Sequence, residues 1–170
     1  MGEFDPERLL QTLVRNGVHF VVIGGFAGTM HGSPYVTFDL DVTPERSGQN
    51  LERLALALKD LDAKIRVEGV TDGLPFDASA EFLGRVELLN LTTEAGELDI
   101  AFAPSGLSGY EELAEDALQI EVRGTSFAVA SLRDVIRSKT AADRPKDRLA
   151  LPALRALLAR QDADPPDAHE

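Results

Sequence analysis

The sequence of 170 residues contains no cysteine, no long apolar run and few basic residues. The lack of cysteine excludes disulfides, thiolate metal sites and a cysteine nucleophile. No apolar run approaches the roughly 18 residues of a membrane span, and no signal-peptide core is present, so we expect a cytoplasmic protein without a membrane partner. There is also no Ser/His/Asp arrangement, P-loop or Rossmann fingerprint, which argues against hydrolase, P-loop NTPase and dinucleotide-binding functions.

The charge is strongly acidic, with 17 Lys and Arg against 29 Asp and Glu and a formal net charge of −12. Taken alone, this balance argues against a nucleic-acid partner. However, the segment from Arg133 to Arg160 holds eight basic residues and only three aspartates. Such a segment is compatible with local binding of a polyanion, or with an ordinary solvated helix face.

The periodicity of apolar residues predicts one α/β (α+β) domain, and the hydrophobic content of 44% is sufficient for its core. Strands and helices do not alternate regularly, so we expect a mixed β-sheet flanked by helices, with further helices at the C-terminus. The pattern predicts helices over 6–15, 26–31, 47–61, 110–115, 132–142 and 146–160, strands over 19–23, 38–42, 63–67, 86–91, 98–102, 118–122 and 125–129, and loops over 70–82 and 104–109. The last ten residues, 161–170, have the composition of a disordered tail.

Two aspartates in the strand-like segment VTFDLDV are the strongest chemical signal. Side chains two positions apart in a strand point the same way, about 6.5–7 Å from each other. Asp39 and Asp41 therefore share one face with Thr37, while Phe38, Leu40 and Val42 are predicted on the apolar face. Two carboxylates on one face repel each other unless a cation lies between them, although an ordinary solvated surface strand is the alternative.

A third carboxylate would complete a two-metal site. Asp99 in the strand-like ELDIAF is the best candidate, and Glu97 shares its face as the fallback. Hard oxygen ligands without cysteine indicate Mg²⁺ or Mn²⁺. Two such ions held by Asp39 and Asp41, with Asp99 activating a hydroxyl, would drive in-line phosphoryl or nucleotidyl transfer.

A glycine pair, Gly24 and Gly25, follows the apolar run that ends at Ile23. Glycine lets the backbone approach a ligand closely, and a helix beginning at Phe26 would direct free N–H groups at an anion. A simple turn between strand and helix is the alternative.

The combination of GG, a later DLD and a lone Asp on another strand resembles the nucleotidyltransferase superfamily, with the DNA polymerase β-like fold. Its members include DNA polymerase β and the kanamycin and CCA-adding enzymes. The longer pattern GGFAGTMHGSPYVTFDLDV is similar to the AbiEii/MenT branch, the nucleotidyltransferase toxins of toxin–antitoxin pairs. The segment SLRDVIRSKTAADRPKD, residues 131–147, resembles the second signature of that branch.

The resemblance implies a role for each matching residue. Gly24 and Gly25 would receive the NTP phosphates, and Lys139 would touch the triphosphate, although a lysine on a helix is more often simply solvent-facing. The metal ligands would be Asp39, Asp41 and Asp99, with Asp99 as the base, and the second signature would add Arg144, Lys146 and Asp147. Residues 1–130 would form the catalytic core, and residues 131–160 would complete the site.

Two residues that precede Asp39 in the sequence, Thr37 and Tyr35, have further implications. In these toxins a Ser or Thr in the place of Thr37 can be phosphorylated by a partner, which blocks the site; plain β-propensity is the alternative explanation for Thr37. The family often has Arg where this sequence has Tyr35, so a cation near the phosphates is absent there.

The sequence therefore predicts a metal-dependent transfer of NMP from an NTP to an acceptor hydroxyl. The resemblance implies that the acceptor is the tRNA 3′ end, that translation would be blocked, and that a cognate antitoxin, which could be a kinase acting on Thr37, is a partner. The alternatives are nucleotidylation of a protein or small molecule, and a non-catalytic NTP-binding or partner-binding module on the same fold.

Overall fold

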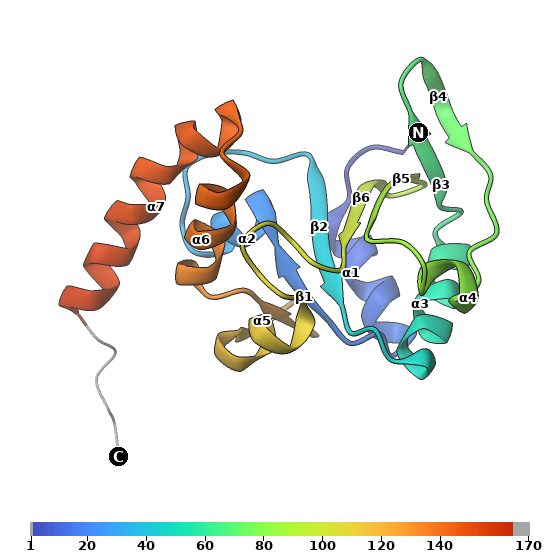
Figure 1. The fold of residues 1–170 in the computed structure, drawn as a ribbon, viewed down its shortest axis with the longest axis horizontal. Helices are drawn as coiled ribbons and strands as arrows, with labels where there is room; N and C mark the ends of the chain where they lie inside the picture. The colour runs from blue at the N-terminus through green and yellow to red at the C-terminus, as the bar shows by residue number, and fades with distance from the viewer. Residues whose placement is uncertain (1, 165–170) are drawn as a thin grey trace.

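An eight-stranded mixed sheet forms the centre of the computed structural model, which describes residues 2–164 (Figure 1). The helices are α1 (Pro6–Arg15), α2 (Gly24–Met30), α3 (Gly48–Asp60), α4 (Ala80–Leu83), α5 (Tyr110–Asp116), α6 (Leu132–Ala142) and α7 (Pro145–Ala163). The strands are β1 (Phe20–Ile23), β2 (Asp39–Pro44), β3 (Lys64–Val67), β4 (Val70–Leu74), β5 (Leu88–Thr93), β6 (Gly96–Ala101), β7 (Leu118–Val122) and β8 (Thr125–Val129).

The strands lie in the order β4-β3-β5-β6-β2-β1-β8-β7. Strand β2 runs parallel to β6 and β1 runs parallel to β8, while the other neighbours are antiparallel. The mixed sheet with flanking and C-terminal helices confirms the predicted fold class. Strand β2 lies in the middle of the sheet between β1 and β6, so residues of the distant strand β6 lie beside it.

Local sequence explains the first elements directly. The Asp5 side chain accepts a hydrogen bond from Arg8 N at 3.0 Å, and Pro6 stands at the first turn of α1. Leu9 and Leu13 on its apolar stripe are fully buried. Strand β1 is buried along its whole length, which is the burial expected of an internal strand covered on both faces.

The prediction of a loop over 70–82 is wrong at both ends and holds only for residues 75–79. Strand β4 occupies Val70–Leu74 and α4 begins at Ala80. Val70 and Leu74 are exposed, because β4 is an edge strand that pairs only with β3. Only Gly73 of β4 is buried, so the strand has no apolar alternation in its sequence, and only the pairing of its backbone reveals it.

Three predicted boundaries also differ. The Phe38 side chain, expected on the buried face, is 75% exposed, because β2 begins only at Asp39. Helix α2 begins at Gly24 rather than Phe26, so the glycine pair forms its first turn. In the hairpin of β5 and β6, β5 continues to Thr93 and β6 begins at Gly96. Each strand is therefore two residues longer at the turn than predicted.

Helix α7 continues to Ala163, past the predicted end at Arg160. Residues 165–170, which belong to the predicted disordered tail, lie outside the described residues. Across residues 2–164, no helix has both the length and the apolar character that a bilayer span requires.

Candidate active site

The three predicted carboxylates meet at the centre of the sheet. Asp41 on β2 faces Asp99 on β6 in the parallel register, and Asp39 lies two residues before Asp41 on the same side. One ligand oxygen of each of the three aspartates lies within 4.8 Å of the others. The fallback Glu97 faces Asp39 in the register but is outside this group. The strand pairing therefore builds one three-carboxylate cluster from segments about sixty residues apart.

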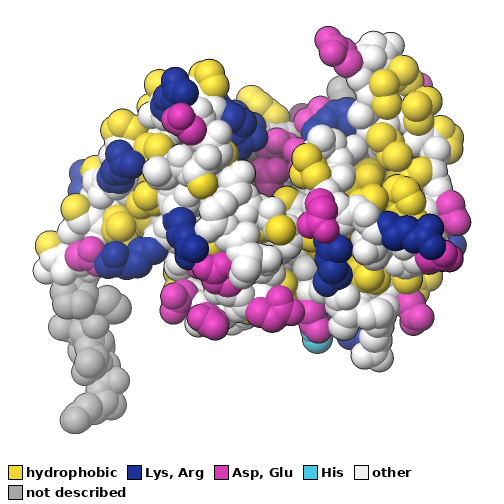
Figure 2. All heavy atoms as spheres, viewed as in Figure 1, with side chains coloured by type: hydrophobic (Ala, Val, Ile, Leu, Met, Phe, Trp, Pro, Cys, Tyr) yellow, Lys and Arg dark blue, Asp and Glu magenta, His cyan; other side chains and the backbone are white. Residues whose placement is uncertain are grey.

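The cluster lies in a cleft of about 730 Å³. Figure 2 shows acidic side chains at the base of a hollow, with basic side chains along its rims. The lining residues come from β1, α2, β2, β3, β5, β6, α6, α7 and the adjoining loops. A volume of this size is within the usual range for a small-molecule or cofactor site.

Gly24 is needed where the chain passes the cluster. Its φ is +68°, and a Cβ built there would lie 2.2 Å from the Asp41 Oδ2 atom. A Cβ at Gly25 would meet the Thr37 side chain at 3.2 Å. The glycine pair therefore lets α2 pack directly against the segment that carries Thr37 and Asp41. It does more than form the simple turn that was the alternative from the sequence.

Burial and like charge make the cluster electrostatically unfavourable without a cation. Burial, followed by the charges of Asp39 and Asp99, raises the pKa of Asp41 from 3.8 to about 7, against the opposing effect of Lys146 and Arg144. Burial also raises the pKa of Asp99, which Arg66 opposes. A divalent ion would relieve both effects, so the donor set fits Mg²⁺ or Mn²⁺ held by Asp39, Asp41 and Asp99.

The raised pKa of Asp41 predicts a pH dependence. The folded chain holds a proton on Asp41 up to about pH 7, whereas the unfolded chain loses it near 3.8. The free energy of unfolding of the metal-free protein should therefore fall as the pH rises through this window. Because a metal must displace that proton, added Mn²⁺ should raise the melting temperature more at pH 8 than at pH 6.

Thermal melts of wild type and Asp41→Asn at both pH values, with and without Mn²⁺, test this dependence. Subtracting the variant isolates the contribution of Asp41 from that of other titrating groups. An equal Mn²⁺ shift at the two pH values would contradict the prediction.

A cationic wall formed by Lys139, Arg144 and Lys146 lies on the α6/α7 side of the cleft. Asp147 anchors it, because its fully buried carboxylate lies 3.4 Å from Lys139 Nζ and accepts a 2.7 Å hydrogen bond from Arg144 Nε. Burial alone would raise the pKa of Asp147, but the hydrogen bonds from Arg144 and the nearby positive charges outweigh it and hold the pKa below its usual value. Lys139 is only 12% exposed, so it is not the freely solvated lysine considered from the sequence.

Replacing Asp147 by Asn should destabilise the protein by about 3 kcal/mol, because two cations would lose a buried counter-ion. Asp143→Asn is the matched control, since Asp143 pairs with Arg148 at 2.7 Å on the exposed surface. Asp143 has φ +51°, a conformation that Asn tolerates, so this control should change the stability by less than about 0.5 kcal/mol. Urea denaturation measures both, and equal losses for the two variants would contradict a special role for the buried carboxylate.

Most of the basic segment 133–160 is used for internal ion pairs. Arg133 pairs with Asp162, Arg137 with Glu112 and Arg148 with Asp143. Lys139 and Arg144 share Asp147. The segment therefore offers less free positive charge than its composition indicates, and its cleft-facing part is the cationic wall.

Thr37 and Tyr35 both line the cleft. The Thr37 hydroxyl donates a 2.5 Å hydrogen bond to Asp39 Oδ1, so it does share the acidic face. Tyr35 is 41% exposed at the cleft mouth. The ring of His31 donates to Ala130 O at 2.8 Å and so links the end of α2 to the segment after β8.

Arg66 on β3 is a cleft residue that the sequence analysis missed. Its Nη2 lies 2.7 Å from Asp99 Oδ1, and its Nη1 lies 2.7 Å from Glu97 Oε2. It reaches both carboxylates across β5, which lies between β3 and β6 in the sheet. No spacing in the sequence relates Arg66 to Asp99, because the contact depends on the strand order.

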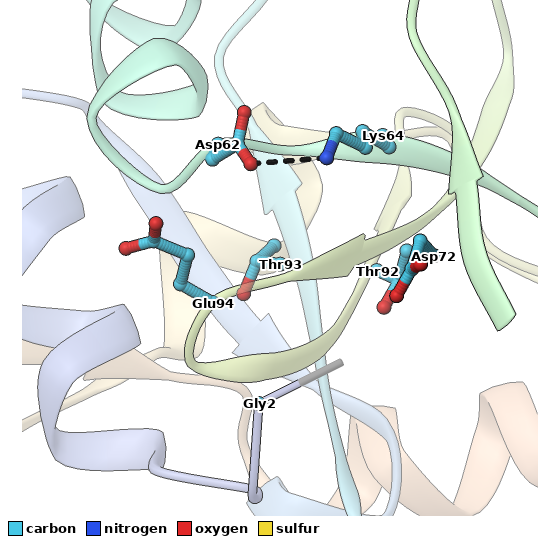
Figure 3. A pocket seen from close by; sticks show the side chains of 7 residues that line it. All are labelled: Gly2, Asp62, Lys64, Asp72, Thr92, Thr93 and Glu94. Atoms are coloured by element: carbon cyan, nitrogen blue, oxygen red, sulfur yellow. Dashed lines mark ion pairs between the residues drawn. The ribbon is translucent and has the colours of Figure 1, made fainter.

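A second, smaller cavity of about 310 Å³ is lined by Gly2 and by residues of β3, β4, β5 and their adjoining turns (Figure 3). Asp62 and Lys64 form an ion pair of 3.1 Å on its wall, and Glu94 lies nearby on the turn between β5 and β6. The cavity shares no lining residue with the cleft. The three-carboxylate cluster therefore defines the candidate active site.

The overall fold is that of nucleotidyltransferases. A lincosamide antibiotic adenylyltransferase, LnuA, solved with lincomycin, matches with a TM-score of 0.59 at 14% identity, over 92% of this chain and 99% of that one. A candidate nucleotidyltransferase from Thermotoga maritima matches with a TM-score of 0.51 at 15% identity, over 94% and 97% of the two chains. The antibiotic-resistance factor ANT(2'')-Ia matches with a TM-score of 0.51 at 15% identity, over 93% and 91%. No family model and no curated protein match the sequence.

Proposed function

We propose that the protein is a metal-dependent nucleotidyltransferase that moves NMP from an NTP to an acceptor hydroxyl. One observation carries the proposal: Asp39, Asp41 and Asp99 place ligand oxygens within 4.8 Å of one another in the cleft. The cationic wall on one side of the same cleft supports it, because a triphosphate needs positive charge next to the metal site. The nucleotidyltransferase fold is consistent with this activity.

Each site residue then has a role in the proposed reaction. The divalent ions would be held by Asp39, Asp41 and Asp99, and their charge would stabilise the negative charge that develops on the α-phosphate. Lys139, Arg144 and Lys146 would bind the β- and γ-phosphates, with Asp147 orienting the first two. Gly24 and Gly25 would border the triphosphate. Residues 1–130 would thus supply the catalytic core, and residues 131–160 would complete the site.

In the proposed step, the acceptor oxygen attacks the α-phosphorus and a new P–O bond forms. The bond from the α-phosphorus to the bridging oxygen breaks, and pyrophosphate leaves with that electron pair. Asp99 accepts the hydroxyl proton as general base. The products are the nucleotidylated acceptor and pyrophosphate.

As the acceptor we propose the 3′ end of tRNA, which would make the protein an AbiEii/MenT-type toxin that blocks translation. The two sequence signatures support this assignment. RNA binding should weaken as salt increases, because basic residues near the cleft would contact phosphates. A cognate antitoxin would then be the natural protein partner.

Phosphorylation of Thr37 by such a partner would switch the enzyme off. The Thr37 hydroxyl donates to Asp39 Oδ1 at 2.5 Å, so a phosphate there would replace a hydrogen bond by charge repulsion beside the metal ligands. It would also repel the incoming triphosphate.

A hydroxyl of a small molecule is the second candidate acceptor. Two structures that match over nearly the whole chain are an adenylyltransferase of lincosamide antibiotics and an antibiotic-resistance factor. The largely paired charges of the basic segment also favour a small acceptor over a long polyanion.

The test is incubation of purified protein with Mg²⁺, each α-labelled NTP in turn, and either total tRNA or lincomycin. The Asp39→Asn/Asp41→Asn double variant is the inactive control. Label on tRNA with wild type alone establishes the enzyme, its nucleotide and its acceptor class. Label on lincomycin or on a protein band supports transfer but redirects the acceptor.

If no acceptor is labelled and no pyrophosphate is released, while mass spectrometry shows Thr37 unmodified, the enzyme proposal fails. Binding of NTP without turnover would then identify a non-catalytic NTP-binding module. Absence of both would overturn the nucleotide proposal altogether.

A further inference from the structure

The sheet ends in two edge strands, β4 and β7, each of which pairs with one neighbour only. The free backbone N–H and C=O groups of an edge strand can pair with another chain, so proteins usually protect such edges. The pairing of β4 with β3 is irregular, with a shift of register between Ile65 and Val67. In contrast, β7 pairs with β8 through five consecutive residue pairs. Strand β7 is therefore the more regular of the two edges.

Strand β7 also carries an exposed apolar row. Leu118, Ile120 and Val122 alternate along one face, where Leu118 is 48% exposed, Val122 is 39% exposed and Ile120 is half-buried. Gln119 and Glu121 are exposed on the other face. The strand contains neither proline nor lysine, the residues that most often protect an edge. Apart from its pairs with β8, no hydrogen bond to this strand is found within residues 2–164.

The turn between β7 and β8 fixes which backbone groups of β7 point outward. Both residues of this two-residue turn, Arg123 and Gly124, have positive φ, as in a type I′ hairpin. The pair that closes such a hairpin, here Val122 with its partner on β8, is hydrogen-bonded, and bonded pairs alternate with non-bonded pairs along the strands. The backbone N–H and C=O groups of Gln119 and Glu121 therefore point away from β8, towards the free edge.

A second copy of the chain fits this edge best in one antiparallel register. Antiparallel strands bond through residues whose backbone groups point at the partner strand, which are Gln119 and Glu121 here. A pair centred on Ile120 opposes all five residues of β7 with the five of the other copy, and it places Gln119 opposite Glu121 twice. A pair centred on Glu121 would oppose two carboxylates directly. A pair centred on Gln119 would oppose fewer residues of the two strands.

Both faces of β7 are self-complementary in the register centred on Ile120. Leu118 opposes Val122 of the other copy and Ile120 opposes its own equivalent, so the exposed apolar row is covered. These apolar pairs fall at the non-hydrogen-bonded positions, where the side chains of opposite strands lie closest. On the other face, the carboxylate of Glu121 meets the amide of Gln119, which can donate a hydrogen bond to it. The strand sequence LQIEV therefore pairs with its own reverse without a clash of charge.

We propose that β7 is a self-association surface, through which two copies of the chain form a symmetric dimer with one sheet continuous across both β7 strands. Of the described residues that line the cleft, none belongs to β7 or β8, so the proposal is independent of the proposed activity. One short strand from each copy makes a small interface, so the dimer is weak and transient. The net charge of −12 on each chain opposes association, so added salt strengthens it.

The test changes one exposed residue of β7 to either charge. Gln119→Glu places a carboxylate opposite Glu121 of the other copy, and Gln119→Lys places an ammonium group there. Thr71→Glu and Thr71→Lys are the matched controls, because Thr71 is exposed on the other edge strand, β4, and its variants have the same net charges. Sedimentation equilibrium of the full chain over a concentration series measures the dissociation constant of the dimer. Circular dichroism and thermal melts check that each variant is folded.

We expect wild type to dimerise as its concentration rises. Gln119→Glu should weaken the dimer about fivefold or more, and Gln119→Lys should strengthen it by a similar factor, because two cross-strand pairs change in each dimer. Gln119→Glu/Glu121→Lys should reverse the loss, because each carboxylate then meets an ammonium group. Both Thr71 variants should stay within about twofold of wild type, because they change only the net charge.

A folded wild-type chain that remains monomeric at every concentration overturns the proposal. Equal effects of Gln119→Glu and Gln119→Lys on a dimer that does form also overturn it, because the register requires effects of opposite sign. A dimer that responds to the Thr71 variants and not to the Gln119 variants places the contact at β4 and excludes β7. All of these substitutions change exposed side chains, so loss of the dimer with an unchanged melting temperature reports on the interface alone.

Discussion

Replacing Asp41 by Asn should abolish divalent-metal binding and lower nucleotidyl transfer at least about 10³-fold, while stabilising the metal-free protein at pH 8. The catalytic loss follows because Asp41 is the most central carboxylate of the cluster, level with Asp99 and two residues from Asp39. The stability gain follows because its pKa is raised to about 7, so at pH 8 the wild type carries a buried charge that its neighbours repel. We expect the free energy of unfolding to rise by at least about 1 kcal/mol.

Mn²⁺ titration by calorimetry, transfer assays and urea denaturation measure these three effects. Asp134→Asn is the matched control, because burial also raises the pKa of Asp134 but this residue lies outside the cleft lining. It should leave metal binding and transfer intact. A loss of stability in Asp41→Asn together with a loss of activity would indicate a structural role instead of a functional one.

Substituting Gly24 by Ala should remove the metal site through the backbone. The new Cβ would lie 2.2 Å from Asp41 Oδ2, so the carboxylate must move away from Asp39 and Asp99. The φ of +68° adds strain of about 1–2 kcal/mol for any residue with a Cβ. We expect destabilisation of about 3 kcal/mol or more and the loss of measurable Mn²⁺ binding.

Gly69→Ala separates strain from collision. Gly69 has φ +81° in the turn between β3 and β4, and beyond its chain neighbours no atom lies within 4 Å of the position that a Cβ would take. It should lose only the strain of about 1–2 kcal/mol and bind Mn²⁺ as wild type does. If Gly24→Ala and Gly69→Ala have equal stability and both bind Mn²⁺, the close approach of Gly24 to Asp41 is not needed for the site.

The two walls of the cleft have different origins. The cationic wall comes from α6 and α7, where the buried Asp147 holds Lys139 and Arg144. On another side the cleft is lined by residues of β5 and β3, in the antiparallel part of the sheet, where Arg66 is neutralised by Glu97 and Asp99. The two sides of the cleft therefore differ in charge.

Local sequence was sufficient for the parts of the site that lie on one strand or one helix. Because strand side chains alternate, the spacing of Asp39 and Asp41 placed both carboxylates on one face, and Thr37 with them. The same alternation identified Asp99. Helices with clear caps and apolar stripes, such as α1 and α3, were predicted close to their observed bounds.

Where the prediction failed, the signal was weak or absent along the chain. Strand β4 buries only Gly73 and so has no apolar alternation. Phe38 precedes β2, although alternation alone would have placed its side chain in the core. The basic composition of 133–160 indicated free positive charge, yet five of its eight basic residues form ion pairs with acids of the same chain.

The sequence by itself thus determined the carboxylates, their shared face and the chemistry that a divalent ion would bring to them. Only the tertiary structure decided what surrounds them: that Asp41 faces Asp99, that Gly24 touches Asp41, and that Arg66 and Asn90 stand beside the third carboxylate. The physical reason is that side-chain alternation is a local property of one strand. The order and register of strands arise from pairing between segments that the linear sequence does not relate.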